Sequence, residues 1–181
     1  MTRIIGGTAG GRQIAVPPTG TRPTSDRVRE ALFSALEARG VIEDAEVLDL
    51  FAGSGALGIE ALSRGASTAI LVERDPRACA VIQSNVGVAG VHGALVRRSA
   101  VDAFLRKTPG PVDLVFVDPP YTDTGDSVNQ VVARLPRWTR RDAVVVIERD
   151  ARSPAPVWPE GFEPDDPRVY GETTLYLATV S

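Results

Sequence analysis

The stretch from Val47 to Gly65 constrains the fold of this chain most strongly, because it joins an apolar run, a glycine turn and a helical repeat. Its first residues, Val-Leu-Asp-Leu-Phe at 47–51, form the short apolar run expected of a strand buried on both faces. Gly53 and Gly55 let the backbone turn sharply and let a ligand approach closely. Leucine and alanine then recur at helical spacing. The stretch therefore predicts a strand, a tight turn and a helix whose N-terminal N–H groups face an anionic group.

The glycine turn fits more than one kind of ligand. Its glycines at 53, 55 and 58 match the dinucleotide fingerprint, and Glu73 follows about 20 residues later, where a ribose-binding acid belongs. Asp49 favours a different ligand, because an acid at the end of the strand repels a pyrophosphate and attracts an ammonium group. A turn that only packs the helix on the strand is a third interpretation. The turn therefore favours a ligand with an amino-acid end but leaves a nicotinamide dinucleotide open.

Length and composition bound the class of protein. The 181 residues predict one main domain, over 24–181, with a substantial core. No signal peptide is recognisable, and no apolar run approaches the ~20 residues of a membrane span. The single cysteine, Cys79, excludes an internal disulfide framework, and the single histidine, His92, lacks partners at the spacing of metal ligands. We therefore expect a cytoplasmic protein without a metal centre.

Residues 1–23 predict a β-hairpin arm, because two short β-prone runs flank a glycine-rich turn. Such a hairpin is too small to be stable alone and must lie against the domain or a partner. The total charge of −3 does not indicate a nucleic-acid binder, but the first 30 residues carry five arginines against two acids. We expect these arginines to contact a phosphate backbone, and the alternative is an ordinary solvated helix face. They are Arg3, Arg12, Arg22, Arg27 and Arg29.

A second informative stretch is the apolar run 112–117, which ends in Asp-Pro-Pro-Tyr. The two prolines stop a strand and present carbonyl oxygens without competing N–H donors. Asp118 adds a carboxylate at the carboxyl end of the strand, where open α/β sheets bind ligands, and Tyr121 offers a flat ring for stacking. Acceptors beside an aromatic ring suit a planar base with an exocyclic amino group. The alternative is a strand-ending turn with a surface acid.

The remaining pattern alternates strands and helices, which predicts successive βαβ units and a mostly parallel sheet. Residues 150–167 read as a loop and residues 169–180 as a closing hairpin or edge strand. The other expected strands are 69–73, 95–97 and 143–148, and the other expected helices are 26–39, 75–88 and 124–136.

The two informative stretches together resemble a known family. Asp-Leu-Phe-Ala-Gly-Ser-Gly at 49–55 with Asp-Pro-Pro-Tyr at 118–121 resembles class I methyltransferases that modify exocyclic amino groups of bases. The segment Arg-Pro-Thr-Ser-Asp-Arg-Val-Arg-Glu-Ala-Leu-Phe at 22–33, with the Arg-Ile-Ile-Gly-Gly start and the Val-Tyr-Gly-Glu-Thr end, resembles the RsmD family of bacterial 16S ribosomal RNA guanine-N2 methyltransferases. The resemblance covers nearly the whole chain. It implies a Rossmann-like α/β fold, with a seven-stranded, mostly parallel sheet, helices on both faces and a reversed C-terminal strand.

The resemblance also implies a role for individual residues. The cofactor S-adenosylmethionine would be bound by Asp49, Phe51, Gly53, Gly55, Glu73, Ser99 and Ala100, with Glu73 at the ribose and the last two at the adenine. Asp118, Pro119 and Tyr121 would act on the substrate, one guanine of 16S ribosomal RNA in a partly assembled small subunit. The RNA itself would be held by the five arginines of the first 30 residues.

These residues predict a direct displacement. Asp118 and the Pro119 carbonyl would accept the two amine hydrogens, so that the nitrogen can pyramidalise and aim its lone pair at the methyl carbon. Three alternatives remain: methylation of an adenine or cytosine amino group in RNA or DNA, an NAD-dependent oxidoreductase, and a non-catalytic RNA-binding module. Asp49 opposes the oxidoreductase, and the intact Asp118 and Tyr121 oppose the non-catalytic module.

Overall fold

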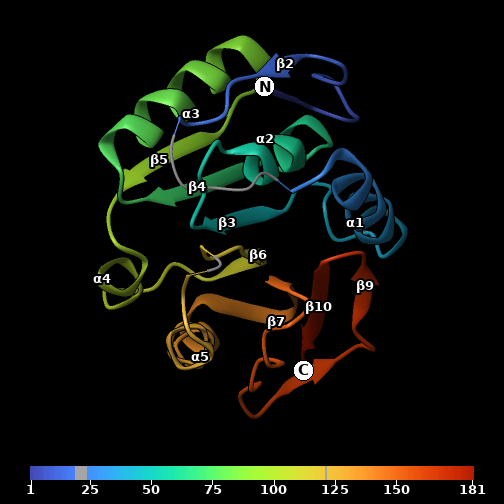
Figure 1. Ribbon diagram of the computed structural model, residues 1–181, viewed down its shortest axis with the longest axis vertical. Coiled ribbons are helices and arrows are strands. Elements are labelled where there is room, and N and C mark those ends of the chain that lie inside the picture. Colours follow the sequence, from blue (N-terminus) through green and yellow to red (C-terminus); the bar gives the residue numbers. More distant parts are fainter. Residues whose placement is uncertain (19–23, 121) are drawn as a thin grey trace.

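A mostly parallel sheet organises the computed structural model, which describes residues 1–18, 24–120 and 122–181 (Figure 1). Its strands run in the order β5-β4-β3-β6-β7-β10-β8, with β9 also paired to β10. Strands β5 to β7 are parallel, and β10 is antiparallel to its neighbours. The strand bounds are β3 Glu46–Leu50, β4 Thr68–Glu73, β5 Ala94–Arg98, β6 Val112–Val117, β7 Thr139–Asp150, β8 Phe162–Pro164, β9 Arg168–Tyr170 and β10 Thr173–Val180.

Eight strands make up this sheet in the described residues, where the resemblance implied seven. The difference lies at the outer edge of β10. Strand β9 pairs with the start of β10 and β8 with its end, so the two short strands together occupy one position. Strand β8 falls inside residues 150–167, so the expectation of a loop there is wrong for three residues. The reversed C-terminal strand is confirmed by β10.

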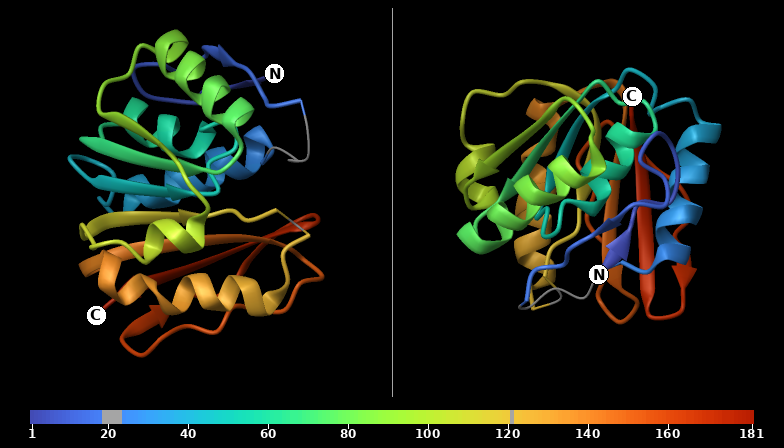
Figure 2. Two further views of the ribbon diagram at one scale, coloured as in Figure 1. Left: turned by 90° about the vertical axis from the view of Figure 1, so that its left-hand side faces the viewer. Right: turned by 90° about the horizontal axis from the view of Figure 1, so that it is seen from above.

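Helices cover both faces of the sheet, as expected (Figure 2). One face packs against α1 Asp26–Ala38, α2 Ala56–Ser63 and α3 Pro76–Ala89, and the other against α4 Val101–Leu105, α5 Gly125–Ala133 and the 3-10 helix Leu135–Trp138. Strand side chains alternate between the two cores. In β6, for example, Phe116 faces α1 while Val115 and Val117 face the α5 side. Both faces are therefore buried, and only the strand ends remain for ligands.

Side-chain caps begin helices α1 and α3. Ser25 caps α1 by accepting a hydrogen bond from the N–H of Val28, and Asp75 caps α3 by accepting one from the N–H of Arg77. Because Ser25 is the cap, the hydroxyl of neighbouring Thr24 is available elsewhere, and it points into the site described below.

The N-terminal arm is the expected hairpin, with β1 Thr2–Arg3 antiparallel to β2 Gln13–Ile14. Ile4, Ala9 and Ile14 are fully buried against α2 and α3, so apolar contacts hold the arm on the domain. The described residues contain no helix long and apolar enough to cross a membrane. They also contain no cluster of three or more metal-type ligands.

Candidate active site

The site lies at the point where the strand order of the sheet changes direction, between β3 and β6. From β3 the chain adds β4 and β5 on one side, then returns through α4 to place β6 on the other side of β3. The carboxyl ends of β3 and β6 therefore part at a switch point, the usual ligand crevice of such sheets. Phe51 follows β3 there in a left-handed conformation, with φ of 61°, which is rare for a bulky residue and marks a constrained turn.

Asp49 is the most buried carboxylate of this crevice, with a relative exposure of 1%. Its Oδ2 accepts a hydrogen bond of 2.9 Å from the N–H of Gly58, while its Oδ1 has no partner among the described residues. Burial raises the pKa of Asp49 to about 7, and the charge of Glu73 adds to this effect while the Gly58 N–H opposes it. A buried acceptor without a donor is a position that a ligand donor can satisfy.

The glycines of the turn meet different structural requirements. Gly55 begins α2 with φ of 82°, and a Cβ there would lie 3.1 Å from Ile82 and 3.2 Å from Leu71. A Cβ at Gly58 would lie 2.8 Å from Leu71. At Gly53, with φ of 60°, the left-handed backbone favours glycine, and a Cβ there would meet no side chain but would face the crevice that Gly53 lines. The expectation that Gly55 clears space for a ligand is wrong, because its Cβ would point into the core.

Glu73 braces the turn from the end of β4. Its Oε1 accepts from the N–H of Gly53 at 3.0 Å, and its Oε2 accepts from the N–H of Asp75 at 2.8 Å. The carboxylate also lines a cavity that Ser99 and Ala100 share. The arrangement brings the three expected adenosine contacts together, and their roles stay predictions.

Two cavities occupy the crevice and adjoin each other. The larger, about 450 Å³, contains Asp49, Phe51, Gly53, Pro119 and Glu148. The smaller, about 270 Å³, contains Glu73, Ser99 and Ala100. Both are lined by Phe51, Asp118 and Pro120, so Asp118 stands where the two spaces meet. One elongated ligand can therefore span them, with room left beside Asp118 in the larger cavity.

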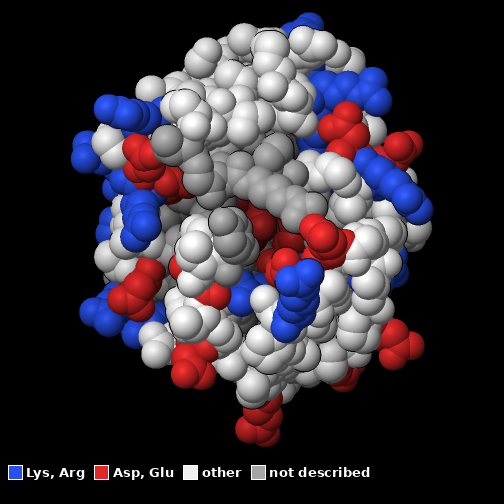
Figure 3. Space-filling view, in the orientation of Figure 1, with Lys and Arg blue, Asp and Glu red and all other residues white. Residues whose placement is uncertain are grey.

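A pair of carboxyl groups defines the larger cavity. Val117 of β6 is paired with Ile147 of β7, and Asp118 and Glu148 are the next residues of the two chains. Their side chains are therefore neighbours at the carboxyl ends of these parallel strands. Burial raises the pKa of Asp118 well above its ordinary value, and the nearby charges of Glu148 and Asp49 raise it further. Thr24 donates a hydrogen bond of 2.6 Å to Oε2 of Glu148. Figure 3 shows acidic side chains in the central hollow and basic ones both directly below the hollow and farther out on this face.

The expected RNA contacts divide into exposed and internal arginines. Arg3 has an exposed side chain that pairs with Asp26 at 3.1 Å, and Arg27 is exposed. Arg12 donates to the carbonyls of Val88 and Ala89, so it caps the C-terminus of α3. Two expected residues lie outside the described residues: Arg22, and Tyr121 of the catalytic set.

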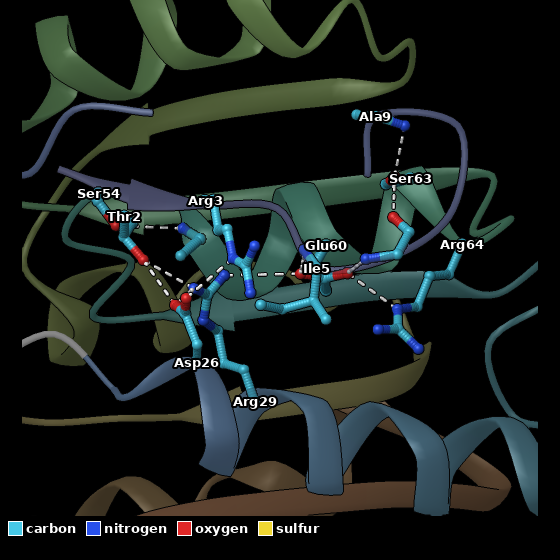
Figure 4. A network of polar contacts seen from close by, with 12 residues as sticks. Thr2, Arg3, Ile5, Ala9, Asp26, Arg29, Ser54, Glu60, Ser63 and Arg64 are labelled. Carbon is cyan, nitrogen blue, oxygen red and sulfur yellow. Dashed lines mark hydrogen bonds and ion pairs between the residues drawn. The ribbon is translucent and has the colours of Figure 1, made fainter. Parts of the chain in front are cut away.

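Arg29 is fully buried, so the expectation that it extends an RNA-facing surface is wrong. Its Nη2 donates to Thr2 at 2.7 Å and to Asp26 at 2.8 Å, and its Nη1 lies 3.5 Å from Oε1 of Glu60 (Figure 4). Glu60 in turn accepts from the N–H groups of Ile5 and Gly6 and from Arg64. This network joins the arm, α1 and α2, and its members Thr2 and Arg29 line one side of the larger cavity. Its physical cause is that the arm covers the face of α1 on which Arg29 lies.

Sequence reasoning missed Glu148, Glu60 and Asn85. Asn85 is buried in α3, exchanges hydrogen bonds with Ala15 of the arm and donates to the carbonyl of Ser54 in the glycine turn. Glu148 carried a usable signal, since it follows the apolar run 143–147 as Glu73 follows the run 69–72. Asn85 carried a weaker one, an amide on the apolar face of a helix.

Comparison with known proteins identifies the family of this chain. The family model described as Conserved hypothetical protein 95 matches residues 2–179. Ribosomal RNA small subunit methyltransferase D of Escherichia coli is 38% identical, over 97% of this chain and 88% of that protein. The structure of yhhF from Escherichia coli has a TM-score of 0.88 at 37% identity, covering 99% of this chain and 97% of that one. A hypothetical protein of Thermus thermophilus has a TM-score of 0.87 at 33% identity, covering 99% and 100%. The chain therefore belongs to the RsmD family of methyltransferases, the family that this model describes.

Proposed function

We propose that this enzyme transfers a methyl group from S-adenosylmethionine to the exocyclic N2 of one guanine in 16S ribosomal RNA. One observation carries the proposal: Asp118 and Pro119 stand beside a crevice whose inner end holds the buried, unpaired Oδ1 of Asp49. A methyltransferase needs a cofactor site and an amine site that meet, and Asp118 lies at the junction of the two cavities.

The residues of the crevice fit the cofactor. An ammonium group offers three donors, which suits the unpaired Oδ1 of Asp49. The N–H groups of Ala56 and Gly58 at the N-terminus of α2 already donate to Ser54 and Asp49, so it is the helix dipole at this end that favours a carboxylate beside that ammonium. Glu73 lies in the smaller cavity, where its carboxylate can accept from ribose hydroxyls, with Ser99 and Ala100 beside it for the adenine.

The chain's own residues act mainly by orientation. When bound, the sulfonium supplies an electrophilic methyl group. Asp118 and the Pro119 carbonyl accept the amine hydrogens, which holds the nitrogen lone pair toward the cofactor cavity. Because Asp118 and Pro119 lie in the crevice, a bound base excludes water from them, and this strengthens the contacts to the amine. The base must leave its stack to reach Asp118, and stacking on Tyr121 offsets that cost in this proposal.

The RNA substrate is proposed from the family and from the charge pattern. The Escherichia coli relative is named for the small-subunit ribosomal RNA. In this chain, exposed Arg3 and Arg27 lie near the start of α1, and Thr2 and Thr24 from the same region line the larger cavity. Basic groups at the margin can hold phosphates while the acidic hollow receives an amino-bearing base. A partly assembled small subunit in the cytoplasm would present that base.

Labelled methyl transfer tests the proposal. Naked 16S ribosomal RNA, small subunits from unmodified cells and DNA are each incubated with the enzyme, and the labelled nucleoside is identified. We expect N2-methylguanosine from the RNA or the particle, and Asp118→Ala serves as the inactive control. Labelled N6-methyladenosine or N4-methylcytidine would contradict the guanine assignment. Calorimetry with S-adenosylmethionine and with NAD separates the methyltransferase from the oxidoreductase.

A further inference from the structure

We propose that Glu148 determines the specificity for guanine, because its carboxylate accepts the N1–H of the base while Asp118 accepts an N2–H. The inference rests on the proposed function and deepens it. It assigns a substrate contact to Glu148, which the sequence predicted only as part of a sheet strand.

The geometry of the strand ends supports two adjacent acceptors. Parallel pairing of β6 and β7 places Glu148 beside Asp118, and both line the larger cavity. Neighbouring strands lie about 4.8 Å apart, which is close enough for two carboxylates to reach neighbouring atoms of one base edge. A single planar group can therefore contact both.

The chemistry of the base edge matches this pair. Guanine presents two neighbouring donors, N1–H and the 2-amino group. Adenine and cytosine instead present a ring-nitrogen acceptor beside the amino group. Ionised carboxylates only accept hydrogen bonds, so Glu148 attracts a ring N–H and repels a ring-nitrogen lone pair. An edge with two donors can satisfy both carboxylates, whereas an edge with one donor sets its ring-nitrogen lone pair against a carboxylate that Thr24 holds in place.

Thr24 positions Glu148 for this contact. Its hydroxyl donates to Oε2 of Glu148 at 2.6 Å, which restricts rotation of the carboxylate. The mutual proximity of the two acids, which raises the pKa of Asp118, means that the ligand-free pair retains a proton more readily than either acid alone. Binding of guanine donors takes the place of that proton, which leaves to solvent.

The test changes both the base at the methylated position and the side chain at position 148. Small-subunit RNA is prepared with either guanine or 2-aminopurine at the methylated position. The analogue keeps the 2-amino group and has a bare N1 acceptor. We expect the wild-type enzyme to prefer guanine by at least about 10-fold in kcat/KM. Glu148→Gln can donate from its amide to the bare N1, so we expect the ratio of the two kcat/KM values to shift toward 2-aminopurine by at least about 10-fold.

Two controls distinguish recognition from a structural role. Glu163→Gln makes the same change on exposed β8, outside both cavities, and should leave the ratio unchanged. If Glu148→Gln lowers kcat/KM for both RNAs by one common factor, or changes neither, the inference is overturned. Thermal unfolding of each variant checks that the fold is intact.

Binding of the same two RNAs to enzyme saturated with S-adenosylhomocysteine gives a readout independent of turnover. A guanine preference that Glu148→Gln shifts would uphold the inference even if methyl transfer were absent and the proposed function failed. Guanine methylation with an unshifted preference would overturn the inference and leave the proposed function standing. Methylation of adenine by the wild-type enzyme would overturn both.

Discussion

Thr24 and Glu148 are joined by a hydrogen bond of 2.6 Å although 124 positions separate them in the sequence. The bond connects the segment before α1 to Glu148 in β7, so the start of the domain reaches the wall of the larger cavity. Neighbouring Ser25 has a different task, since it caps α1. Two adjacent hydroxyls thus serve the site and the helix separately.

This division predicts different effects of two neighbouring substitutions. Thr24→Val keeps the shape and removes the donor, so we expect kcat for RNA to fall by about 10-fold, the effect of losing a charge-assisted contact that orients a substrate acceptor. Cofactor affinity should be unchanged, and Thr24→Ser should restore kcat. Ser25→Ala should instead lower the free energy of unfolding by about 1 kcal/mol through loss of the cap. Equal kcat for Thr24→Val and wild type would separate Thr24 from the site.

The raised pKa of Asp49 predicts a pH dependence of stability and of cofactor binding. Its pKa is about 7 in the folded protein against an ordinary value of 3.8 in the unfolded chain, so the folded state holds the proton more tightly. Stability of the ligand-free protein should therefore fall as the pH rises from about 4 to about 7 and then level off. An ammonium ligand needs the ionised form, so cofactor affinity should rise over the same window with release of a proton.

Calorimetry in buffers of different ionisation enthalpy measures that proton, and Asp49→Asn should abolish both the release and the pH dependence. Asp49→Asn should also weaken binding, because a charge-assisted contact is worth about 1.5–3 kcal/mol. A wild-type affinity that stays constant from about pH 5.5 to about pH 7.5, across the window in which Asp49 ionises, would remove Asp49 from the ammonium contact.

Substitution of Asp118 should impair methyl transfer without impairing cofactor binding. We expect Asp118→Ala to lower kcat by at least about 10²-fold, because the contact to the amine tightens toward the transition state. Affinity for S-adenosylmethionine should stay close to wild type. Should affinity fall while kcat is preserved, Asp118 would belong to the cofactor cavity instead. Titration calorimetry and single-turnover kinetics on the same variant decide between the two.

The arginines of α1 should behave in opposite ways. Arg29→Ala removes a buried cation that faces Asp26 and Glu60, so we expect a loss of about 3 kcal/mol in the free energy of unfolding. This is the lower end of the usual range, because Arg64 still pairs with Glu60. Arg27→Ala should leave stability unchanged and weaken RNA binding, with the salt dependence of log K reduced by about one unit per lost phosphate contact. Denaturant unfolding and RNA titration at several salt concentrations measure both. An Arg29→Ala variant of wild-type stability would contradict the network.

The sequence determined the elements that depend on short-range patterns. The apolar run, the glycines and the helical repeat around Asp49 specify a strand, a turn and a helix, because backbone freedom and side-chain periodicity act within a few residues. The same holds for Asp118, which directly follows its strand. Strand β8 was missed since three residues carry too little pattern, and it forms only because β10 offers a free edge.

Only the tertiary structure decided which of these residues meet. Glu148 comes beside Asp118 through the register of β6 and β7, and strand pairing depends on the packing of the whole sheet rather than on either strand. Arg29 has the pattern of a surface residue within its own helix, yet it is buried where α1 meets the arm and α2. Its partners Thr2, Asp26 and Glu60 come from all three of these elements. The sequence thus determined the local elements that carry Asp49 and Asp118, and long-range packing decided that Glu148 joins them in the larger cavity and that Arg29 is buried.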